Sequence, residues 1–251
     1  SMSQGKMENA ALPKRFYERA AFDPVDAGYI ITLDGKHVKT PARNLLQVKQ
    51  LDLAAAIAAE WDAQREVIHP DTMPLTRLMH IALDRVSQDR SALLQDIAQY
   101  VETDLLCYRV PVGGGTHALD PDNVSLRQKQ DATFDPILDW VEQQFAAPFA
   151  TTDGVLPVEQ SPTSVAAIAA VFAAANDHQL AALAMMVPLV GSALLTLAVW
   201  KCFLGVEDAL VAARLDENAQ AERWGEDLEV TRAWEVKAND IRACAFFLTH
   251  N

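Results

Sequence analysis

The alternation of apolar and polar side chains predicts a β-hairpin at residues 28–40. Its turn is Asp34-Gly35, a dipeptide that favours the two-residue connection because both central positions need positive φ. A hairpin alone is only marginally stable in water, so we expect it to pair with further strands or to pack on the next part of the chain. The candidate neighbouring strands are residues 16–17 and 45–48.

From residue 51 onward the spacing of apolar residues changes from two to about 3.6, which is the period of an α-helix. Pro74 suits the first turn of one of these helices, because that position needs no N–H partner. Asp135-Pro136 is typical of a cap followed by a first-turn proline and predicts that a new helix begins there. Pro188 is an expected break in a later helix. The predicted apolar stripes include Leu53, Ile57 and Trp61, and then Leu75, Leu78, Met79 and Ala82.

The order of these elements indicates an α+β fold, because the strands come first and the helices come after them without alternation. We expect a small N-terminal antiparallel β-rich domain at residues 13–50 and a larger, mainly α-helical domain at residues 51–251. The boundary is open between residue 50 and about residue 70, since patterning alone does not fix where elements end.

The run from Leu180 to Trp200 contains no charged side chain and is long enough to be tested as a membrane span. Pro188 and Gly191 interrupt it, and no clear Lys/Arg bias flanks it. A helix that is apolar on all sides in a water-soluble protein usually forms the buried centre of a bundle. We therefore expect a buried helical centre and no stable membrane insertion.

Composition narrows the choice of partner. The chain of 251 residues has 34 acidic and 21 basic side chains, a formal net charge of −13. Such an acidic protein is not expected to bind DNA, RNA or an anionic bilayer as its main partner, because all three carry the same sign of charge. The charge instead favours solubility.

The cysteines and residues 1–12 indicate the cellular compartment in which the protein is expected. Cys107, Cys202 and Cys244 are odd in number and far apart, which is typical of buried free thiols in a reducing compartment. Residues 1–12 contain neither an apolar signal core nor an Arg-rich presequence. We expect a bacterial cytoplasmic protein; the alternative is a mature organellar form from which a presequence has been removed.

The common catalytic and metal-binding patterns are missing from the sequence. Its six histidines show neither an i, i+4 pair nor a His-Glu-x-x-His arrangement. Residues 113–115 form a glycine run without the Lys-Ser/Thr of a phosphate-binding loop. Glu102 and Asp104, two residues apart on a helix, point to different faces and are poor candidates for shared acid–base chemistry; nearby Arg109 is expected to pair with one of them. We predict no catalytic residue, no metal and no cofactor.

The rival interpretation is an enzyme or small-molecule-binding protein. Its site would lie at the junction of the β-rich and helical parts, because a cleft between domains is a usual place for ligands. The residues considered for such a site are Tyr29, Trp61, Arg77 and Arg109.

Residues 210–227 place charge on a helical face that is otherwise apolar. At about 3.6 residues per turn, Leu210 and Trp224 share that face and Glu217 lies near its centre. Asp216 is displaced by nearly a quarter turn towards solvent. A carboxylate in apolar surroundings is costly unless it is paired or hydrogen-bonded. Two interpretations fit: Glu217 has an internal arginine partner, or the acidic pair marks a docking edge for another molecule.

The same segment is one of six blocks that succeed one another between Lys14 and Asp240. The blocks are KRFY at 14–17, LDGKHVKTPARNLL at 33–46, EWDAQREVIHPDTMPLTRL at 60–78, ETDLLCYR at 102–109, FDPILDW at 134–140 and ARLDENAQAERWGED at 213–227. In this order the chain resembles the Atp-twelve family, the alpha-subunit assembly chaperones of the F-type ATP synthase.

The resemblance implies a function that composition and periodicity do not reveal. It implies an ATP-independent chaperone that binds the unassembled alpha subunit of the F-type ATP synthase and shields its subunit interface until the beta subunit replaces it. We expect a monomer without a cofactor. The resemblance places bacterial members in the cytoplasm and eukaryotic relatives in the mitochondrial matrix.

Carried over onto this sequence, the family motif marks Asp216, Glu217, Gln220 and Trp224 as partner-binding residues. The motif has an acidic residue at the position of Asp216, to which we assign the outward charged contact. Glu217 is expected to orient inward, and Trp224 to fix the helix end. Trp61 and Arg214 are expected to support the structure or the junction between the two parts.

Overall fold

The computed structural model describes residues 12–113 and 120–251, so residues 114 and 115 of the glycine run lie outside the described residues. Its contacts divide the chain into two compact units. Unit 1 is formed by residues up to Asp89 with Asp177–Ala182 and Phe246–Asn251, and unit 2 by Arg90–Asn176 and Leu183–Ala245. The domain boundary expected near residue 50 stays a prediction, because a compact unit is a cluster of contacts and need not fold alone.

Short antiparallel strands form the sheet of unit 1. They are β1 (Ala20–Val25), β2 (Gly28–Leu33), β3 (Lys36–His37) and β4 (Gln47–Val48). β2 pairs antiparallel with each of the other three strands. The predicted hairpin turn is confirmed, because Asp34 and Gly35 have φ of 49° and 79° between the paired residues Leu33 and Lys36. Gly28 is required for close approach, since at its φ of 141° a Cβ would lie 2.3 Å from the carbonyl oxygen of Val48.

The main partner of the hairpin is β1, and the strand expected at residues 16–17 is wrong. β1 contains Asp23 and Pro24, which are depleted in strands, but it lies at the edge of the sheet, where a missing N–H is tolerated. Phe16 is 75% exposed, whereas Tyr17 is buried and its hydroxyl donates a hydrogen bond to the carbonyl oxygen of Trp61. Residues 16–17 are therefore held by side-chain contacts.

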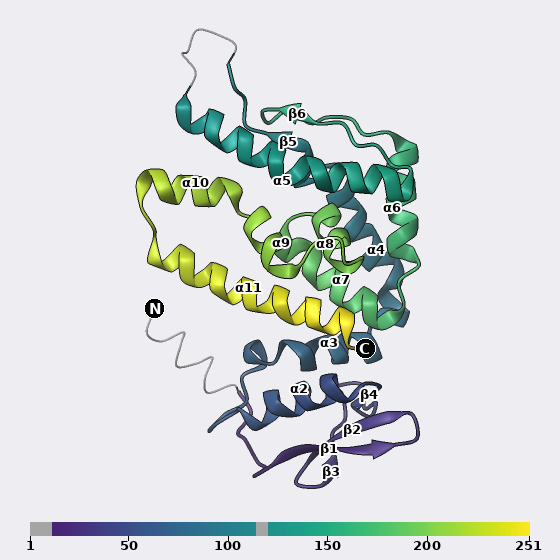
Figure 1. The fold of residues 1–251 in the computed structure, drawn as a ribbon. Coiled ribbons are helices and arrows are strands. Elements are labelled where there is room, and N and C mark those ends of the chain that lie inside the picture. The colour runs from purple at the N-terminus through teal and green to yellow at the C-terminus, as the bar shows by residue number, and fades with distance from the viewer. Residues whose placement is uncertain (1–11, 114–119) are drawn as a thin grey trace. The chain divides into compact units, whose positions relative to one another are not determined.

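The helices of unit 1 match the predicted stripes. They are α2 (Leu51–Asp62), the short 3-10 helix η1 (Pro70–Thr72), α3 (Pro74–Asp84) and the start of α4 (Val86–Glu102). In Figure 1, α2 lies along the sheet, and its Leu53 and Ile57 side chains are fully buried. Glu60 on α2 caps α3, because its carboxylate accepts hydrogen bonds from the N–H groups of Leu75 (2.8 Å) and Thr76 (2.7 Å).

Two later segments complete unit 1. The ring of His178 stacks on that of Phe247, with centroids 6.2 Å apart, and the Phe247 side chain is fully buried. Gln50 Nε2 donates a hydrogen bond to the backbone oxygen of Asn251 at 3.2 Å. Residues distant in sequence are therefore part of the core around the N-terminal sheet.

Unit 2 is mainly helical. Besides the rest of α4 it contains η2 (Leu105–Cys107), β5 (Tyr108–Arg109), α5 (Pro121–Phe145), β6 (Thr152–Asp153), α6 (Pro162–Ala173), α8 (Ala193–Trp200), α9 (Val206–Ala212) and α10 (Leu215–Trp224). It also contains α7 (Asp177–Val190) from Leu183 onward and α11 (Leu228–Thr249) as far as Ala245. Strands β5 and β6 form a parallel pair. With the antiparallel sheet near the N-terminus and helices elsewhere, the expected α+β fold is confirmed.

Helix α5 is continuous through Pro136, so the helix start expected at Asp135-Pro136 is wrong. Phe134 and Ile137 are buried on either side of the proline. The carboxylate of Asp135 pairs with Arg109 Nη2 at 2.8 Å. Packing and this ion pair keep the backbone helical across a residue that removes one hydrogen bond.

The uncharged run forms α7 and α8, and most of its side chains are buried, as expected. The chain breaks at Gly191, whose φ is 80°, and the Ser192 hydroxyl then caps α8 by accepting from Leu195 N–H at 3.0 Å. Pro188 lies inside α7, so the expected break at Pro188 is wrong. Within the described residues, every helix is too short or too polar to cross a membrane.

The expectation of three buried thiols is only partly right. Cys107 and Cys244 are buried and reduced, whereas Cys202 is exposed. Cys202 lies in the turn after α8, where its φ is 60° and its side chain is exposed.

Candidate functional site

The motif at residues 210–227 folds as two helices. α9 ends at Ala212, α10 begins at Leu215, and Arg214 between them has φ of −128° and ψ of 27°. α9 buries Leu210, but no residue of α10 is buried. The single apolar face expected from α9 to Trp224 is therefore wrong, because the break turns the second helix away from the first.

An open groove of about 500 Å³ lies between α10 and the first turns of α11. We call it the α10–α11 groove; its lining includes Arg214, Glu217, Gln220, Trp224, Val230 and Trp234. Gly225, with φ of 88°, ends α10, and the Asp227 carboxylate caps α11 by accepting from Glu229 N–H at 2.9 Å. The groove unites three of the four predicted partner-binding residues with Arg214.

The two tryptophans of the groove are each covered on one face by arginine. The guanidinium of Arg214 lies 4.8 Å from the ring centroid of Trp234, and that of Arg223 lies 5.0 Å from Trp224. Trp224 is nevertheless 74% exposed. At this exposure it adds little packing at the helix end, and most of its area is available for contact.

The two acidic residues of the motif lie on different sides of α10. Glu217 lines the groove, is exposed and forms no ion pair within the described residues. The internal arginine partner expected for Glu217 is therefore wrong, and an exposed carboxylate has no burial cost to offset. Asp216 faces α5, where its Oδ1 accepts from Gln130 Nε2 at 3.4 Å, and it also stays exposed. The structure does not bring Asp216 into the groove.

Polar contacts attach α10 to α5. Glu222 lies 3.8 Å from Lys129 Nζ, and Arg223 pairs with Asp120 at 3.2 Å and with Asp122 at 3.3 Å. Exposed ion pairs of this kind contribute about 0–1 kcal/mol each. Because α10 buries no side chain, its hold on the rest of unit 2 is weak.

Trp61 packs inside unit 1. Its ring meets Tyr17 edge to face with centroids 6.0 Å apart, and its carbonyl oxygen accepts from the Tyr17 hydroxyl at 2.6 Å. Its indole nitrogen is buried and has no hydrogen-bond partner among the described residues. These contacts fit the structural role expected for Trp61, and a role at a junction stays a prediction.

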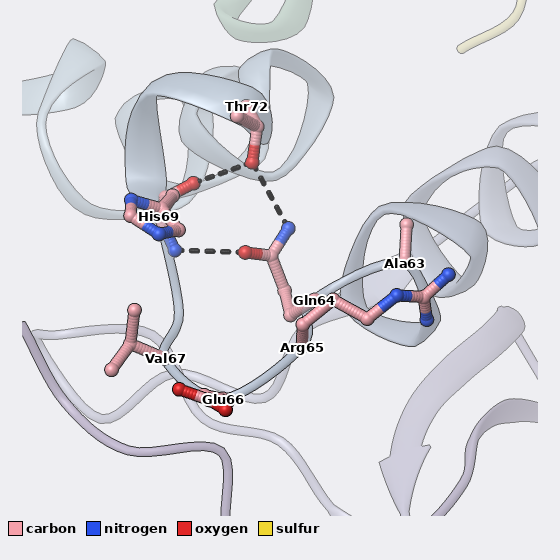
Figure 2. Close-up of a pocket in the computed structure, with 7 residues that line it drawn as sticks. All are labelled: Ala63, Gln64, Arg65, Glu66, Val67, His69 and Thr72. Carbon is pink, nitrogen blue, oxygen red and sulfur yellow. Dashed lines mark hydrogen bonds between the residues drawn. The ribbon is translucent and has the colours of Figure 1, made fainter.

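Another pocket, of about 560 Å³, is lined by the loop after α2 (Figure 2). The side chain of Gln64 braces this loop: it accepts from His69 N–H at 2.8 Å and donates to Thr72 Oγ1 at 3.0 Å. Thr72 Oγ1 donates in turn to the backbone oxygen of His69. Because these groups satisfy one another, the cluster is better suited to shaping the loop than to binding a ligand.

Asp104 is a fully buried carboxyl group, whereas Glu102 beside it is exposed, so the two do not form a catalytic pair. Asp104 accepts from Ser192 Oγ at 2.6 Å and from the N–H groups of Leu194 (2.9 Å) and Leu106 (3.1 Å). Burial raises the pKa of Asp104 to about 6, against the lowering effect of these hydrogen bonds. A perturbed carboxyl is a candidate catalytic group, but these acceptor contacts make Asp104 a second cap of α8 beside the Ser192 hydroxyl.

The residues of the rival small-molecule site are engaged in structural contacts. Arg109 is buried and pairs with Asp131 at 2.7 Å as well as with Asp135, so the expected pairing with Glu102 or Asp104 is wrong. Tyr29 packs against Phe22 with ring centroids 5.7 Å apart. Arg77 pairs with Asp71 at 3.9 Å, and Trp61 packs on Tyr17.

The groove also contains residues that the sequence did not single out. Val230, Trp234 and Glu226 come from the start of α11 and from the turn before it. The sequence signal for these residues was Trp234, a second tryptophan ten positions after Trp224 in an acidic segment. Its position in the groove depends on the turn at Gly225, which the sequence pattern does not fix.

Residues 14–142 match the family model described as ATP12 chaperone protein. Among curated proteins, the mitochondrial protein atp12 of Schizosaccharomyces pombe is 23% identical over 239 residues, which cover 91% of this chain and 78% of that protein.

Solved structures of similar proteins cover nearly the whole chain. Atp12 from Paracoccus denitrificans superposes with a TM-score of 0.81 at 32% identity, covering 94% of this chain and 97% of that one. The Atu1473 protein from Agrobacterium tumefaciens gives a TM-score of 0.83 at 37% identity, covering 95% of this chain and 86% of that one.

Proposed function

This chain belongs to the ATP12 chaperone protein family, and on that premise we propose that it is an ATP-independent chaperone of F-type ATP synthase assembly that binds the unassembled alpha subunit. It covers the surface that the alpha subunit later presents to the beta subunit. The proposal includes a monomeric protein of the bacterial cytoplasm, in keeping with the bacterial origin of the two similar structures.

The observation that carries the proposal is an exposed apolar surface beside unpaired carboxylates on α10 and α11. Trp224 is 74% exposed and Val230 is 52% exposed, and both line the α10–α11 groove. Large exposed apolar side chains that gather on one surface are typical of a protein-binding site. No comparable cluster of catalytic groups competes with this surface among the described residues.

Such a chaperone can bind and release its subunit without hydrolysing a nucleotide. An unassembled subunit aggregates through the apolar surface that its neighbour would cover. A contact of roughly 800 Å² per partner shields such a surface. A dissociation constant near micromolar, about −8 kcal/mol, is strong enough to protect the subunit and weak enough for the beta subunit to displace the chaperone.

Light scattering tests this function directly. Denatured alpha subunit is diluted into nucleotide-free buffer with and without the protein. Suppressed scattering that is reversed by adding beta subunit supports the proposal. Unchanged aggregation of the alpha subunit, or suppression that requires ATP, contradicts it.

We assign partner contact to Asp216, Glu217, Gln220 and Trp224, and the charge of Asp216 gives a first variant. Asp216→Lys should leave the free energy of unfolding within about 0.5 kcal/mol, because Asp216 is exposed and its hydrogen bond is long. Binding of the alpha subunit should fail. Glu142→Lys, an equal charge change at an exposed position of α5, is the matched control and should bind normally. A parallel loss of stability and binding in Asp216→Lys would refute this assignment.

A further inference from the structure

The α10–α11 groove combines aromatic surface with carboxylates. Trp224 and Val230 are both more than half exposed, and Trp234, whose ring is covered by the Arg214 guanidinium, also lines the groove. Glu217, Glu226 and Glu235 also line the groove and are exposed. Apolar surface left in contact with water favours association with another apolar group.

The charge around this apolar surface is one-sided. Glu217 and Glu226 form no ion pair within the described part of the chain. Arg214 is the cation of the lining, and its guanidinium is engaged over the ring of Trp234. The groove therefore presents a negative potential to an incoming molecule, in a protein whose formal net charge is −13.

We propose that the α10–α11 groove binds a segment of the client in which an apolar side chain is flanked by lysine or arginine. The apolar side chain packs on Trp224 and Val230. The flanking cations approach Glu217 and Glu226, and one of them can also stack on the free face of the indole. The identity of the client as the alpha subunit rests on the proposed function. The chemistry of the bound segment is inferred from the groove itself.

The size and charge of the groove favour this occupant over others. A volume of about 500 Å³ is in the range of pockets that enclose one small ligand or a few side chains. A nucleotide or another phosphorylated ligand would bring negative charge to a lining in which carboxylates outnumber the cation Arg214, and that cation is already engaged over Trp234. An acidic peptide is disfavoured for the same reason.

Variants of the groove test whether the client occupies it. In binding titrations with purified alpha subunit, Glu217→Lys/Glu226→Lys should weaken binding about tenfold or more, since opposite charge becomes like charge at two positions. Trp224→Ala should weaken it about thirtyfold, as expected for an aromatic anchor. The matched control Asp139→Lys/Glu142→Lys reverses two exposed charges on α5 and should change binding less than twofold.

A pair of defined peptides tests the chemistry without the client. Acetyl-Lys-Leu-Phe-Leu-Lys-amide and its charge inverse, acetyl-Glu-Leu-Phe-Leu-Glu-amide, are titrated while tryptophan fluorescence is monitored. The basic peptide should bind at least tenfold more tightly than the acidic one, and its fluorescence signal should become smaller in Trp224→Phe, where Trp234 is the remaining tryptophan of the groove. Raising the salt concentration should reduce the difference.

The outcomes separate this inference from the proposed function. If the alpha subunit does not bind the natural sequence while the peptides discriminate in the expected direction, the client assignment fails and the chemistry of the groove stands. If the groove variants bind the alpha subunit as tightly as the control does, the inference is wrong. It is equally wrong if the two peptides bind alike or if neither binds.

Discussion

At Asp104 two opposing effects act on one carboxyl group. Its removal from water favours the protonated form, and hydrogen bonds from the Ser192 hydroxyl and the Leu194 N–H favour the charged form. Burial is the larger effect, so the pKa lies at about 6 instead of 3.8. The folded state therefore binds a proton more tightly than the unfolded chain does, and the free energy of unfolding depends on pH.

The sign of this dependence is a testable prediction. The contribution of Asp104 to stability is fully present below pH 3.8 and is lost as pH rises through 6. Between pH 5 and pH 7.5 the loss is about 1 kcal/mol. Urea unfolding of the natural sequence and of Asp104→Asn at both pH values should show the difference between the two proteins shrinking by that amount. Parallel pH profiles would contradict the prediction.

Single residues of the candidate site could be predicted only in part. The motif placed Glu217, Gln220 and Trp224 together, and the structure gathers them on one groove. Helical spacing wrongly placed Glu217 on a buried face, because the spacing holds only while the helix continues and this one breaks at Arg214. The side to which Asp216 points depends on α5, which is distant in sequence.

At the scale of elements, Pro136 shows tertiary contacts overriding a local preference. Proline in a helix interior costs about 3 kcal/mol relative to alanine, because it lacks the N–H and crowds the preceding turn. α5 accepts this cost because Phe134 and Ile137 are buried and Asp135 pairs with Arg109. No local sequence pattern reveals those contacts, so the sequence wrongly predicted that a helix begins at Asp135-Pro136.

Replacing the proline should therefore stabilise the protein. Pro136→Ala restores an N–H in the middle of α5 and should raise the free energy of unfolding by about 1–3 kcal/mol. Pro162→Ala is the control, because Pro162 occupies the first turn of α6, where proline is favourable, and this change should be neutral or slightly destabilising. Equal effects of the two substitutions in thermal or urea unfolding would contradict the explanation.

The hairpin and β1 show why some elements could be predicted and others could not. Asp34-Gly35 fixes the β2–β3 turn by its own backbone preference, a property that is readable from two residues. β1 has no such local signal, since Asp23 and Pro24 disfavour strands, and it forms because β2 offers a partner. Elements with a strong local cause were therefore predicted, and elements that depend on a neighbour were missed.

For the molecule as a whole, unit 1 depends on residues from late in the sequence. Phe247 is fully buried there and stacks with His178, another late residue. The N-terminal sheet therefore belongs to the same cluster of contacts as residues that come after most of unit 2 in the sequence. A contact of this kind makes distant parts of the chain unfold together.

Phe247→Ala measures this dependence. Deleting a buried phenylalanine should lower the free energy of unfolding by about 3–5 kcal/mol. Amide hydrogen exchange should accelerate in β2 as well as near residue 247. Phe246→Ala removes a neighbouring ring that is only partly buried and should have a smaller effect. Faster exchange confined to the residues around position 247 would show that the late segment is dispensable for unit 1.

The membership of Phe246–Asn251 in unit 1 also has a consequence for biosynthesis. A ribosome that adds about 5–20 residues per second needs roughly ten to thirty seconds to go from Asp89 to this segment. Throughout that interval the nascent sheet lacks Phe247, so this member of a chaperone family spends part of its own translation with an incomplete core.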